Sequence, residues 1–439
     1  MRCSVLYFSI LIIAFLPSCK KITEGVELKT VNVQLMYPAS GSYSTAQGVK
    51  VILKSQATTV ISYTDESGKA TALVPEGIYN ITASEVRPEG LYKIIFNGLN
   101  TGVVVGSSWP QGEEVAVNLV QSKASQVIIK ELFSGGTPKD DGSGYFGNDK
   151  YIILYNNSDE PADISNVCFT AISPYNSNAS NGYYDASGKL VYEAEKWIPA
   201  VQAFWYFQNQ VILQPWQQIV VAINGAIDHT ITYSKSVNLA NADYYCMYDK
   251  ISFTNAAAYP APSALISPNH YLAAQKYSTG NAWSVSVNSP GIFIFNLENT
   301  TPADFASDLD NTHAIPGYTS KKVPFDWVMD ALEAFVLDNA DNKKRFPAAI
   351  DAGSVGLVYG QGYSIYRNVD KEATEAIIGN KDKLVYNYNL GTTDINGSTD
   401  PSGIDAEASI KNGARIVYSD KNNSTTDFHL RAKASLRTN

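Results

Sequence analysis

The feature that most constrains the fold of this chain is a two-residue alternation of apolar and polar side chains in several short segments. The alternation occurs in residues 31–35, 49–53, 79–83 and 115–119. Successive side chains on a strand point to opposite faces, so each segment is expected to form a half-buried β-strand. Turn sequences such as Asp65–Gly68 and Pro75–Gly77 separate these segments. The pattern predicts a small β-sandwich over residues 28–121.

Three stretches of this region carry a family resemblance. They are Gly48–Leu53, Thr64–Ala70 and Val74–Ile81. Together they resemble the carboxypeptidase-regulatory or transthyretin-like module, a seven-stranded sandwich found near the start of Bacteroidetes surface proteins. The resemblance implies a spacer without catalytic residues.

A second region is expected from residue 126 to residue 439. Residues 121–125 are polar and lack a strand pattern, so we place the domain boundary there. Four stretches beyond it resemble the lamin-tail domain, an immunoglobulin-like sandwich. These stretches are Lys150–Ser165, Leu213–Ala222, Ser364–Arg367 and Asp420–Phe428. The resemblance implies a mainly β domain enlarged by long insertions.

Residues 323–336 are the clearest candidate for a helix. Apolar side chains from Trp327 to Val336 recur at intervals of three and four, while Asp330 and Glu333 fall on the other face. This spacing is typical of an amphipathic helix that covers one side or edge of a sheet.

Residues 1–18 are expected to be a lipoprotein signal peptide. Arg2 is followed by an apolar run from Val5 to Leu16, which is shorter than the about 20 residues that span a bilayer. The run ends Leu16-Pro17-Ser18-Cys19 and resembles the bacterial lipoprotein box. The resemblance implies lipidation of Cys19, a tether over residues 19–27, and a protein anchored to the outer membrane on either its surface or its periplasmic side.

The charge balance excludes one class of partner. The chain has 33 Lys and Arg against 42 Asp and Glu, a net charge of −9. A net negative chain without a basic run is unsuited to electrostatic binding of nucleic acid.

No catalytic motif stands out, and we expect no cofactor and no enzyme activity. The sequence has no Gly-x-Ser-x-Gly, no phosphate-binding loop and no His-Glu-x-x-His. The turn containing Asp420, Asn422 and Asp427 offers oxygen ligands that would suit Ca²⁺. Asx turns use the same residue types to bond their own backbone, and we favour that interpretation.

Two cysteines remain beyond the lipidation site, Cys168 and Cys246. Export to an oxidising compartment would allow a disulfide between them. The alternative is a pair of buried free thiols, and the spacing does not decide between the two.

Aromatic residues are the most informative feature for binding. The chain contains 28 Tyr, and aromatic side chains gather between residues 171 and 216. Tyr and Trp suit exposed binding surfaces because a rigid ring provides contact area while its polar tip stays hydrated. The candidate ligand-binding residues are Tyr183, Tyr184, Trp205 and Tyr206. The alternative is that these rings fill the core of the second domain.

The lipoprotein box, the first sandwich and the lamin-tail-like frame together resemble a family of uncharacterised Bacteroidetes lipoproteins, DUF4876. That resemblance implies location and fold but no activity. We expect a lipid-anchored envelope protein that captures or docks a small molecule, glycan or protein, for instance beside a TonB-dependent transporter. The alternatives are a structural or adhesive surface protein and a glycan- or peptide-acting hydrolase.

Overall fold

The computed structural model describes residues 27–39, 43–55, 57–315, 318–337, 339–392 and 398–438. The predicted signal peptide and Cys19 lie outside these residues. The chain forms two compact units. Unit 1 comprises residues up to Val86 and Ile95–Ser122, and unit 2 comprises Arg87–Ile94 and Lys123–Asn439. The predicted mainly β class is confirmed, because both units are built of sheets and the helices are short.

Seven strands form the sheet that makes up unit 1, in the order β3-β2-β5-β6-β7-β1-β4. Their bounds are β1 Leu28–Met36, β2 Lys50–Lys54, β3 Thr59–Tyr63, β4 Lys69–Pro75, β5 Gly77–Glu89, β6 Tyr92–Val105 and β7 Glu114–Ser125. The sequence alternation becomes an alternation of burial: Val31, Val33 and Leu35 are buried, whereas their polar neighbours are partly exposed. One face of the sheet therefore packs on a core, as predicted.

The boundary between the units is a continuous strand rather than the polar linker that the sequence predicts. Residues 121–125 belong to the end of β7, so the chain passes into unit 2 within a strand. Arg87–Ile94 also belong to unit 2, although they precede residue 121. Polar side chains do not end a strand whose backbone groups pair with a neighbour. The polar composition of residues 121–125 therefore does not indicate that the strand continues through them.

Unit 2 is organised around a twelve-stranded sheet of order β24-β23-β20-β13-β15-β19-β18-β17-β11-β8-β25-β26. The strands from one edge to the middle are β24 Val355–Leu357, β23 Val328–Val336, β20 Gly291–Asn296, β13 Val167–Ala171, β15 Ala203–Tyr206 and β19 Tyr271–Lys276. The remaining strands are β18 Tyr245–Met247, β17 Gln218–Ala222, β11 Tyr151–Asn156, β8 Val127–Phe133, β25 Ser364–Arg367 and β26 Phe428–Arg431.

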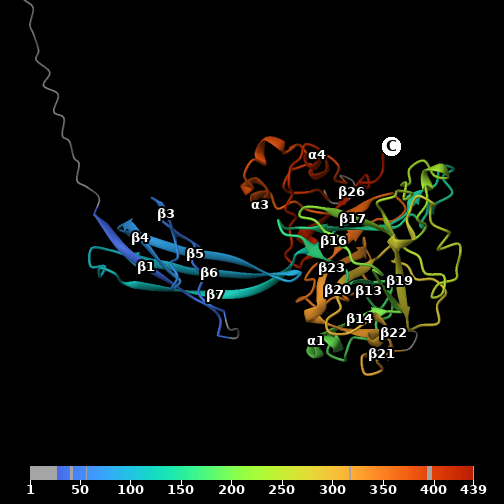
Figure 1. Cartoon of the computed structure of the whole chain (residues 1–439), viewed down its shortest axis with the longest axis horizontal. Helices are drawn as coiled ribbons and strands as arrows, with labels where there is room; N and C mark the ends of the chain where they lie inside the picture. Colours follow the sequence, from blue (N-terminus) through green and yellow to red (C-terminus); the bar gives the residue numbers. More distant parts are fainter. Residues whose placement is uncertain are drawn as a thin grey trace, which may run out of the picture. The chain divides into compact units, whose positions relative to one another are not determined.

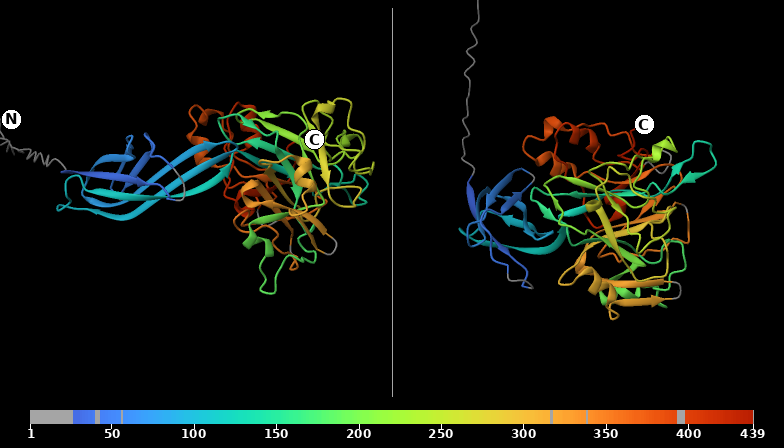
Figure 2. Two further views of the ribbon diagram at one scale, coloured as in Figure 1. Left: turned by 60° about the horizontal axis from the view of Figure 1, so that its bottom comes forward. Right: turned by 45° about the vertical axis from the view of Figure 1, so that its right-hand side comes forward.

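Smaller elements cover this sheet. A three-stranded sheet contains β14 Trp197–Val201, β22 Tyr318–Pro324 and β21 Thr312–Ile315. Two-stranded ribbons pair β9 Thr137–Pro138 with β10 Tyr145–Phe146, and β12 Ala162–Asp163 with β16 Ile212–Leu213. The helices are α1 Val191–Glu195, α2 Pro302–Ser307, α3 Lys371–Ala376, α4 Ala406–Lys411 and α5 Ser424–Asp427, with 3₁₀ turns at His229–Ile231, Pro268–His270, Phe325–Trp327 and Lys381–Lys383. Within unit 2, α3 and α4 lie on the side opposite β21 and β22 (Figures 1 and 2).

The twelve-stranded sheet curls so that strands distant in its order meet. β23 packs against β8, and β24 packs against β26. The main core of unit 2 contains apolar side chains from both halves of the sheet, including Ile129, Ile152, Phe169, Ile294 and Leu332. Because both halves contribute to one core, unit 2 is sandwich-like.

The amphipathic helix predicted over residues 323–336 is wrong. Residues Phe325–Trp327 form a 3₁₀ turn, and Val328–Val336 form β23, between β20 and β24 in the sheet. Asp330 and Glu333 are buried rather than exposed. A strand covered on both faces loses its two-residue alternation, and here the spacing of its apolar residues matches a helical period by coincidence.

Candidate functional site

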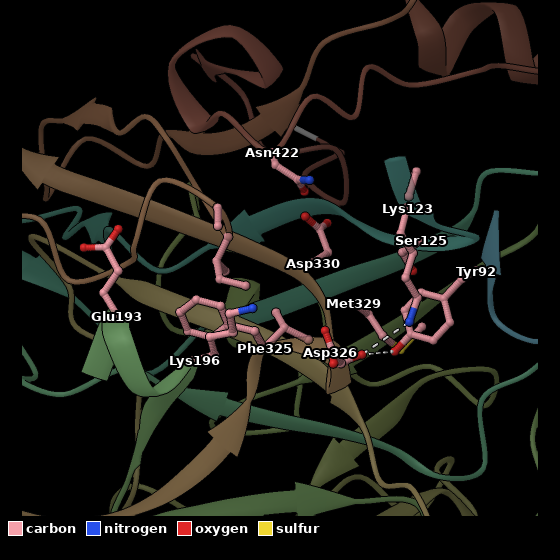
Figure 3. Close-up of a pocket in the computed structure, with 14 residues that line it drawn as sticks. Tyr92, Lys123, Ser125, Glu193, Lys196, Phe325, Asp326, Met329, Asp330 and Asn422 are labelled. Atoms are coloured by element: carbon pink, nitrogen blue, oxygen red, sulfur yellow. Dashed lines mark hydrogen bonds between the residues drawn. The ribbon is translucent and has the colours of Figure 1, made fainter. Parts of the chain in front are cut away.

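Unit 2 contains a cavity of about 400 Å³, drawn in Figure 3. Its walls come from four parts of unit 2: the start of β6 with the end of β7, the end of α1, the 3₁₀ turn with the start of β23, and the loops around residues 350 and 422. The lining residues are Tyr92, Lys123, Ala124, Ser125, Glu193, Lys196, Phe325, Asp326, Val328, Met329, Asp330, Ala349, Ile350 and Asn422. We call this cavity the unit 2 pocket.

Tyr92 fixes one end of the pocket. Its hydroxyl donates to the backbone carbonyls of Asp326 and Trp327 at 3.3 Å each. The ammonium of Lys123 lies 3.4 Å from the centre of the Tyr92 ring and donates to the Asp326 carbonyl at 3.4 Å. A cation over an aromatic face is attracted by the negative face of the ring. These contacts hold the 3₁₀ turn against β6 and β7 within unit 2.

Lys196 forms part of the opposite wall. It ends α1 with φ 54° and ψ 51°, a left-handed conformation, and its N–H donates to the carbonyls of Glu193 and Tyr192. Glycine is the usual residue at such a position, and another residue there costs about 1 kcal/mol. The Lys196 carbonyl accepts a hydrogen bond from the Phe325 N–H at 3.0 Å, so these two residues lie side by side in the wall.

Asp330 lies on a third side of the pocket, and its carboxyl group points toward Asn422 (Figure 3). One carboxylate oxygen accepts from the Ile129 N–H at 2.6 Å and from the Arg367 guanidinium, and the other accepts from the Ala331 N–H at 2.9 Å. Burial raises the pKa of Asp330 to about 7, and the neighbouring Arg367 opposes this rise. Because both of its oxygens already accept hydrogen bonds, Asp330 is held in place rather than free to act as a base.

Arg367 connects the pocket to the sheet. Its Nε donates to the Ile129 carbonyl at 2.7 Å, and its Nη1 donates to the Ser419 carbonyl at 2.9 Å. The N–H and the carbonyl of Ile129 are therefore both bonded to side chains, from β23 and from β25. Asp330 and Arg367 thus join β8 to β23 where the sheet curls, and they fix the shape of this side of the pocket.

The prediction that Tyr183 and Trp205 belong to a ligand-binding surface is wrong. Both are fully buried. Tyr183 bonds to Ser320 at 3.1 Å and packs on Tyr192, with ring centres 5.4 Å apart. Trp205 stacks on Phe253 at 5.4 Å. It lies on β15, an interior strand between β13 and β19, so its ring is covered by the core.

Tyr184 and Tyr206 are half-buried and do not line the unit 2 pocket. The Tyr184 hydroxyl donates to the Lys344 carbonyl at 2.6 Å, and the Tyr206 hydroxyl accepts from the Gln275 side chain at 3.4 Å. The structure does not bring the four predicted rings together as one surface. Tyr183 and Tyr184 belong to one part of the core and Trp205 to another.

The candidate disulfide is contradicted. Cys168 and Cys246 are free and buried, and they lie in different clusters of the core. Burial raises the pKa of the Cys246 thiol to about 12 and raises the pKa of the Cys168 thiol well above its ordinary value. A thiol held neutral in this way is unreactive.

The candidate calcium turn bonds to its own chain. Asp427 accepts hydrogen bonds from the Ser419 hydroxyl and from the N–H groups of Lys421 and Asn423. Asp420 accepts from Arg367. Within the described residues, no group of three or more His, Cys, Asp or Glu is arranged to hold a metal ion. Asn422 instead lines the unit 2 pocket.

Most of the residues that line the pocket could not be predicted from the sequence. Its residues come from segments far apart in the chain, and no motif connects them. Three lining residues fall in segments that the sequence singles out as candidates for binding: Glu193 and Lys196 in the aromatic-rich stretch of residues 171–216, and Asn422 in the candidate calcium turn. The nearby Glu195 accepts a hydrogen bond from the Trp197 indole at 2.8 Å.

Residues 214–402 match the family described as "Protein of unknown function (DUF4876)". The crystal structure of a DUF4876 family protein from Bacteroides thetaiotaomicron is similar in fold, with a TM-score of 0.55 and 19% sequence identity. The alignment covers 94% of this chain and 97% of that chain. At this identity the likeness shows the fold alone. The family resemblance expected from the sequence is thus supported over this part of the chain.

A weaker match is the major pilin subunit of Bacillus cereus, with 13% identity, coverage of 72% of this chain and 98% of that chain, and a TM-score of 0.15. No curated protein matches the chain.

None of the helices in the described part of the chain has the length and apolar content needed to cross a membrane.

Proposed function

We propose that this protein captures a small ligand in the unit 2 pocket without a chemical step. The observation that carries the proposal is the cavity of about 400 Å³ whose wall combines apolar and charged side chains. Ligand pockets in proteins commonly measure about 300–1,000 Å³ and combine an apolar lining with a few polar groups. Phe325, Met329 and Ile350 supply apolar surface here, and Glu193 and Lys196 supply charge.

The rigidity of the wall supports ligand binding. Tyr92, Asp330 and Arg367 are buried and hydrogen-bonded, so little order has to be gained when a ligand enters. A pre-organised site binds more tightly because fewer side chains lose freedom on binding.

We also propose that the protein is lipid-anchored in the bacterial outer membrane and delivers its ligand to a transporter of the TonB-dependent type. The support is the sequence Leu16-Pro17-Ser18-Cys19 after an apolar run. Two or three acyl chains on one cysteine would hold the protein firmly at a bilayer. The transporter partnership rests on analogy of fold and location.

A pocket-filling substitution tests the binding site. Ala349 is exposed and lines the pocket, so Ala349→Trp would place an indole in the cavity. The exposed neighbour Ala348 is not among the lining residues, and Ala348→Trp is the matched control. Each protein would be dialysed against a tryptic digest of casein and against a maltodextrin mixture, and retained compounds identified by mass spectrometry.

We expect the native chain and Ala348→Trp to retain the same compound, and Ala349→Trp to retain at least tenfold less. Retention of nothing from either mixture, or equal retention by Ala349→Trp, would count against the pocket as the binding site.

Replacement of the proposed lipidated residue tests the anchor. We expect Cys19→Ala to move the protein from the membrane fraction to the soluble fraction, because the Cys19 thiol is the proposed site of lipid attachment. Unchanged fractionation, or an unmodified cysteine by mass spectrometry in the native protein, would refute the anchor.

A further inference from the structure

We infer that the unit 2 pocket selects a monocarboxylate with an apolar body, and that Lys196 is the residue that sets this specificity. The inference rests on the proposed function, since it names the ligand class of the same site. It is carried by the backbone conformation of Lys196, by the state of the other charges in the wall, and by the apolar surface beside them.

The backbone at position 196 is suited to glycine, yet the residue is lysine. Six residues other than glycine have positive φ in the described part of the chain: Lys196, Gln202, Trp216, Asn299, Asn387 and Asn422. Two of these, Lys196 and Asn422, line the same pocket. Strained backbone of this kind gathers at binding sites, where the side chain has a use that offsets its cost. Asparagine tolerates this conformation, whereas lysine gains nothing from it.

The Lys196 side chain has little structural use in the fold. Lysine near the end of a helix interacts favourably with the last carbonyl groups, but α1 has only five residues. The side chain is exposed, and within the described residues its ammonium forms no ion pair. The ammonium is therefore available to a ligand.

The other cation of the wall is already engaged. The Lys123 ammonium lies over the Tyr92 ring and donates to the Asp326 carbonyl. Arg367 is bound to Asp330, so this acid does not add a free negative charge to the pocket. Lys196 is thus the cation positioned to pair with an anionic ligand group, and charge-assisted hydrogen bonds of ammonium to carboxylate are among the stronger ones.

The remaining acids limit the ligand to one negative charge. Glu193 and Asp326 are exposed and lie on either side of Lys196 in the wall (Figure 3). A second anionic group near Lys196 would meet one of them, and like charges at close range disfavour binding. Phe325 lies directly beside Lys196 and offers its ring to an apolar body attached to the carboxylate.

The experiment compares three probes that share a phenyl ring: N-acetylphenylalanine, its neutral amide and the dicarboxylate phenylsuccinate. Binding to the full chain would be measured by isothermal titration calorimetry. We expect N-acetylphenylalanine to bind at least tenfold more tightly than the other two. Failure of N-acetylphenylalanine to bind, or equal affinity for its amide, would overturn the inference.

Lys196→Gly separates a binding role from a structural one. We expect N-acetylphenylalanine to bind at least tenfold more weakly while the melting temperature stays the same or rises, because glycine suits this backbone. Lys196→Arg should restore binding to within about threefold, since the charge returns. Asn299→Gly, at φ 57° and outside the pocket lining, is the matched backbone control and should leave binding unchanged.

A lower melting temperature with unchanged binding in Lys196→Gly would show that Lys196 is structural and would overturn the inference. The proposed function would still stand if Ala349→Trp abolished retention of a compound from the casein or maltodextrin mixture. The two proposals can therefore fail separately.

Discussion

At the scale of single residues, the buried charges of β23 connect segments of unit 2 that are distant in the sequence. Glu333 and Arg345 are both fully buried and bond at 2.9 Å, and Lys344 reaches Glu333 at 2.6 Å. Arg345 also donates to the carbonyls of Pro174, Tyr175 and Ser289. Every one of these carbonyls lies outside β23, so one guanidinium connects segments that are distant in the sequence.

Removal of the Arg345 guanidinium should destabilise the fold strongly. Arg345→Met leaves Glu333 without its fully buried cation, and breaking a buried pair on one side costs about 3–5 kcal/mol. Lys344→Met, whose side chain is 30% exposed, is the control and should cost about 0–1 kcal/mol. Urea denaturation measures both free energies of unfolding. Similar losses for the two variants would show that Arg345 is not the cation that Glu333 needs.

His429 should make stability sensitive to acid. Asn368 donates its amide to the Thr426 carbonyl, so its Oδ1 accepts from Nδ1 of His429, and Nε2 then accepts from the Tyr388 hydroxyl. Burial, aided by Arg431, lowers the pKa of His429 to about 3. The folded state therefore keeps the ring neutral while the unfolded state takes up a proton below about pH 6.5. Stability is complete above that pH and falls as pH drops toward the folded pKa.

The expected loss from His429 is about 2–3 kcal/mol between about pH 7.5 and about pH 4.5. His429→Gln cannot titrate, so its free energy of unfolding should fall by that much less over the same interval, even though the variant starts less stable. Urea titrations at both pH values measure the difference. Parallel pH profiles for the two proteins would mean that His429 takes up its proton equally readily in the folded and unfolded states.

The burial of Asp330 and Glu333 and their pairing with arginines could not be predicted from the sequence. Asp330 and Glu333 looked like the polar face of an exposed helix because charged residues are rarely buried without partners. Their partners, Arg367 and Arg345, are displaced in sequence by 37 and 12 residues. Only the folded sheet shows that each acid has a cation, and only then is a strand with two buried acids plausible.

At the scale of elements, alternation predicted strands well where one face is exposed and poorly where both are covered. The strands of unit 1 at residues 28–36 and 69–75 show alternating burial. β8, β11 and β13 are buried at every position. Such strands show no period of two, and the rings of β15 could not be assigned to surface or core for the same reason.

Gly291 in β20 offers a test of how tightly these covered strands pack. A Cβ added there would lie 2.6 Å from Ile172 Cγ2 and 2.9 Å from Arg345 Nη2. Gly291→Ala should therefore cost about 1–3 kcal/mol through overpacking. Gly280→Ala would meet its nearest atom at 3.5 Å and is the matched control. Thermal unfolding compares them, and equal melting temperatures would show that β20 can shift to admit a methyl group.

At the scale of the whole molecule, the sequence predicts a boundary near residue 121, but it does not predict that an earlier stretch of the chain also belongs to unit 2. The stretch Arg87–Ile94 belongs to unit 2 even though most of its neighbours in sequence belong to unit 1. Tyr92 lies in the main core of unit 2, and the Gln126 N–H donates to the Leu91 carbonyl at 2.8 Å. The Lys93 ammonium donates to the Asn157 carbonyl at 2.7 Å. Because this stretch lies within a run of strands, nothing in the sequence distinguishes it from unit 1.

These contacts predict where unit 2 can be cut. A chain of residues 87–439 keeps Tyr92 and retains residues 95–122 as an insertion, and long surface insertions add little to the entropy of loop closure. A chain of residues 123–439 loses the Tyr92 ring from its core, and truncation of a buried aromatic side chain costs about 3–5 kcal/mol. We therefore expect a lower urea midpoint for 123–439 than for 87–439.

Tyr92→Ala in the 87–439 chain is the control that assigns this effect to the ring rather than to the length of the chain. It should account for most of the difference in midpoint, because Tyr92 combines core packing with hydrogen bonds to the turn that shapes the unit 2 pocket. If the 123–439 chain unfolds at the same urea concentration as the longer one, residues 87–94 are not part of the cooperative unit. In that case the part of the pocket wall formed by Tyr92 is dispensable for the fold. The order of the pocket must then come from the opposite side, where Asp330 and Arg367 hold β23 to β8.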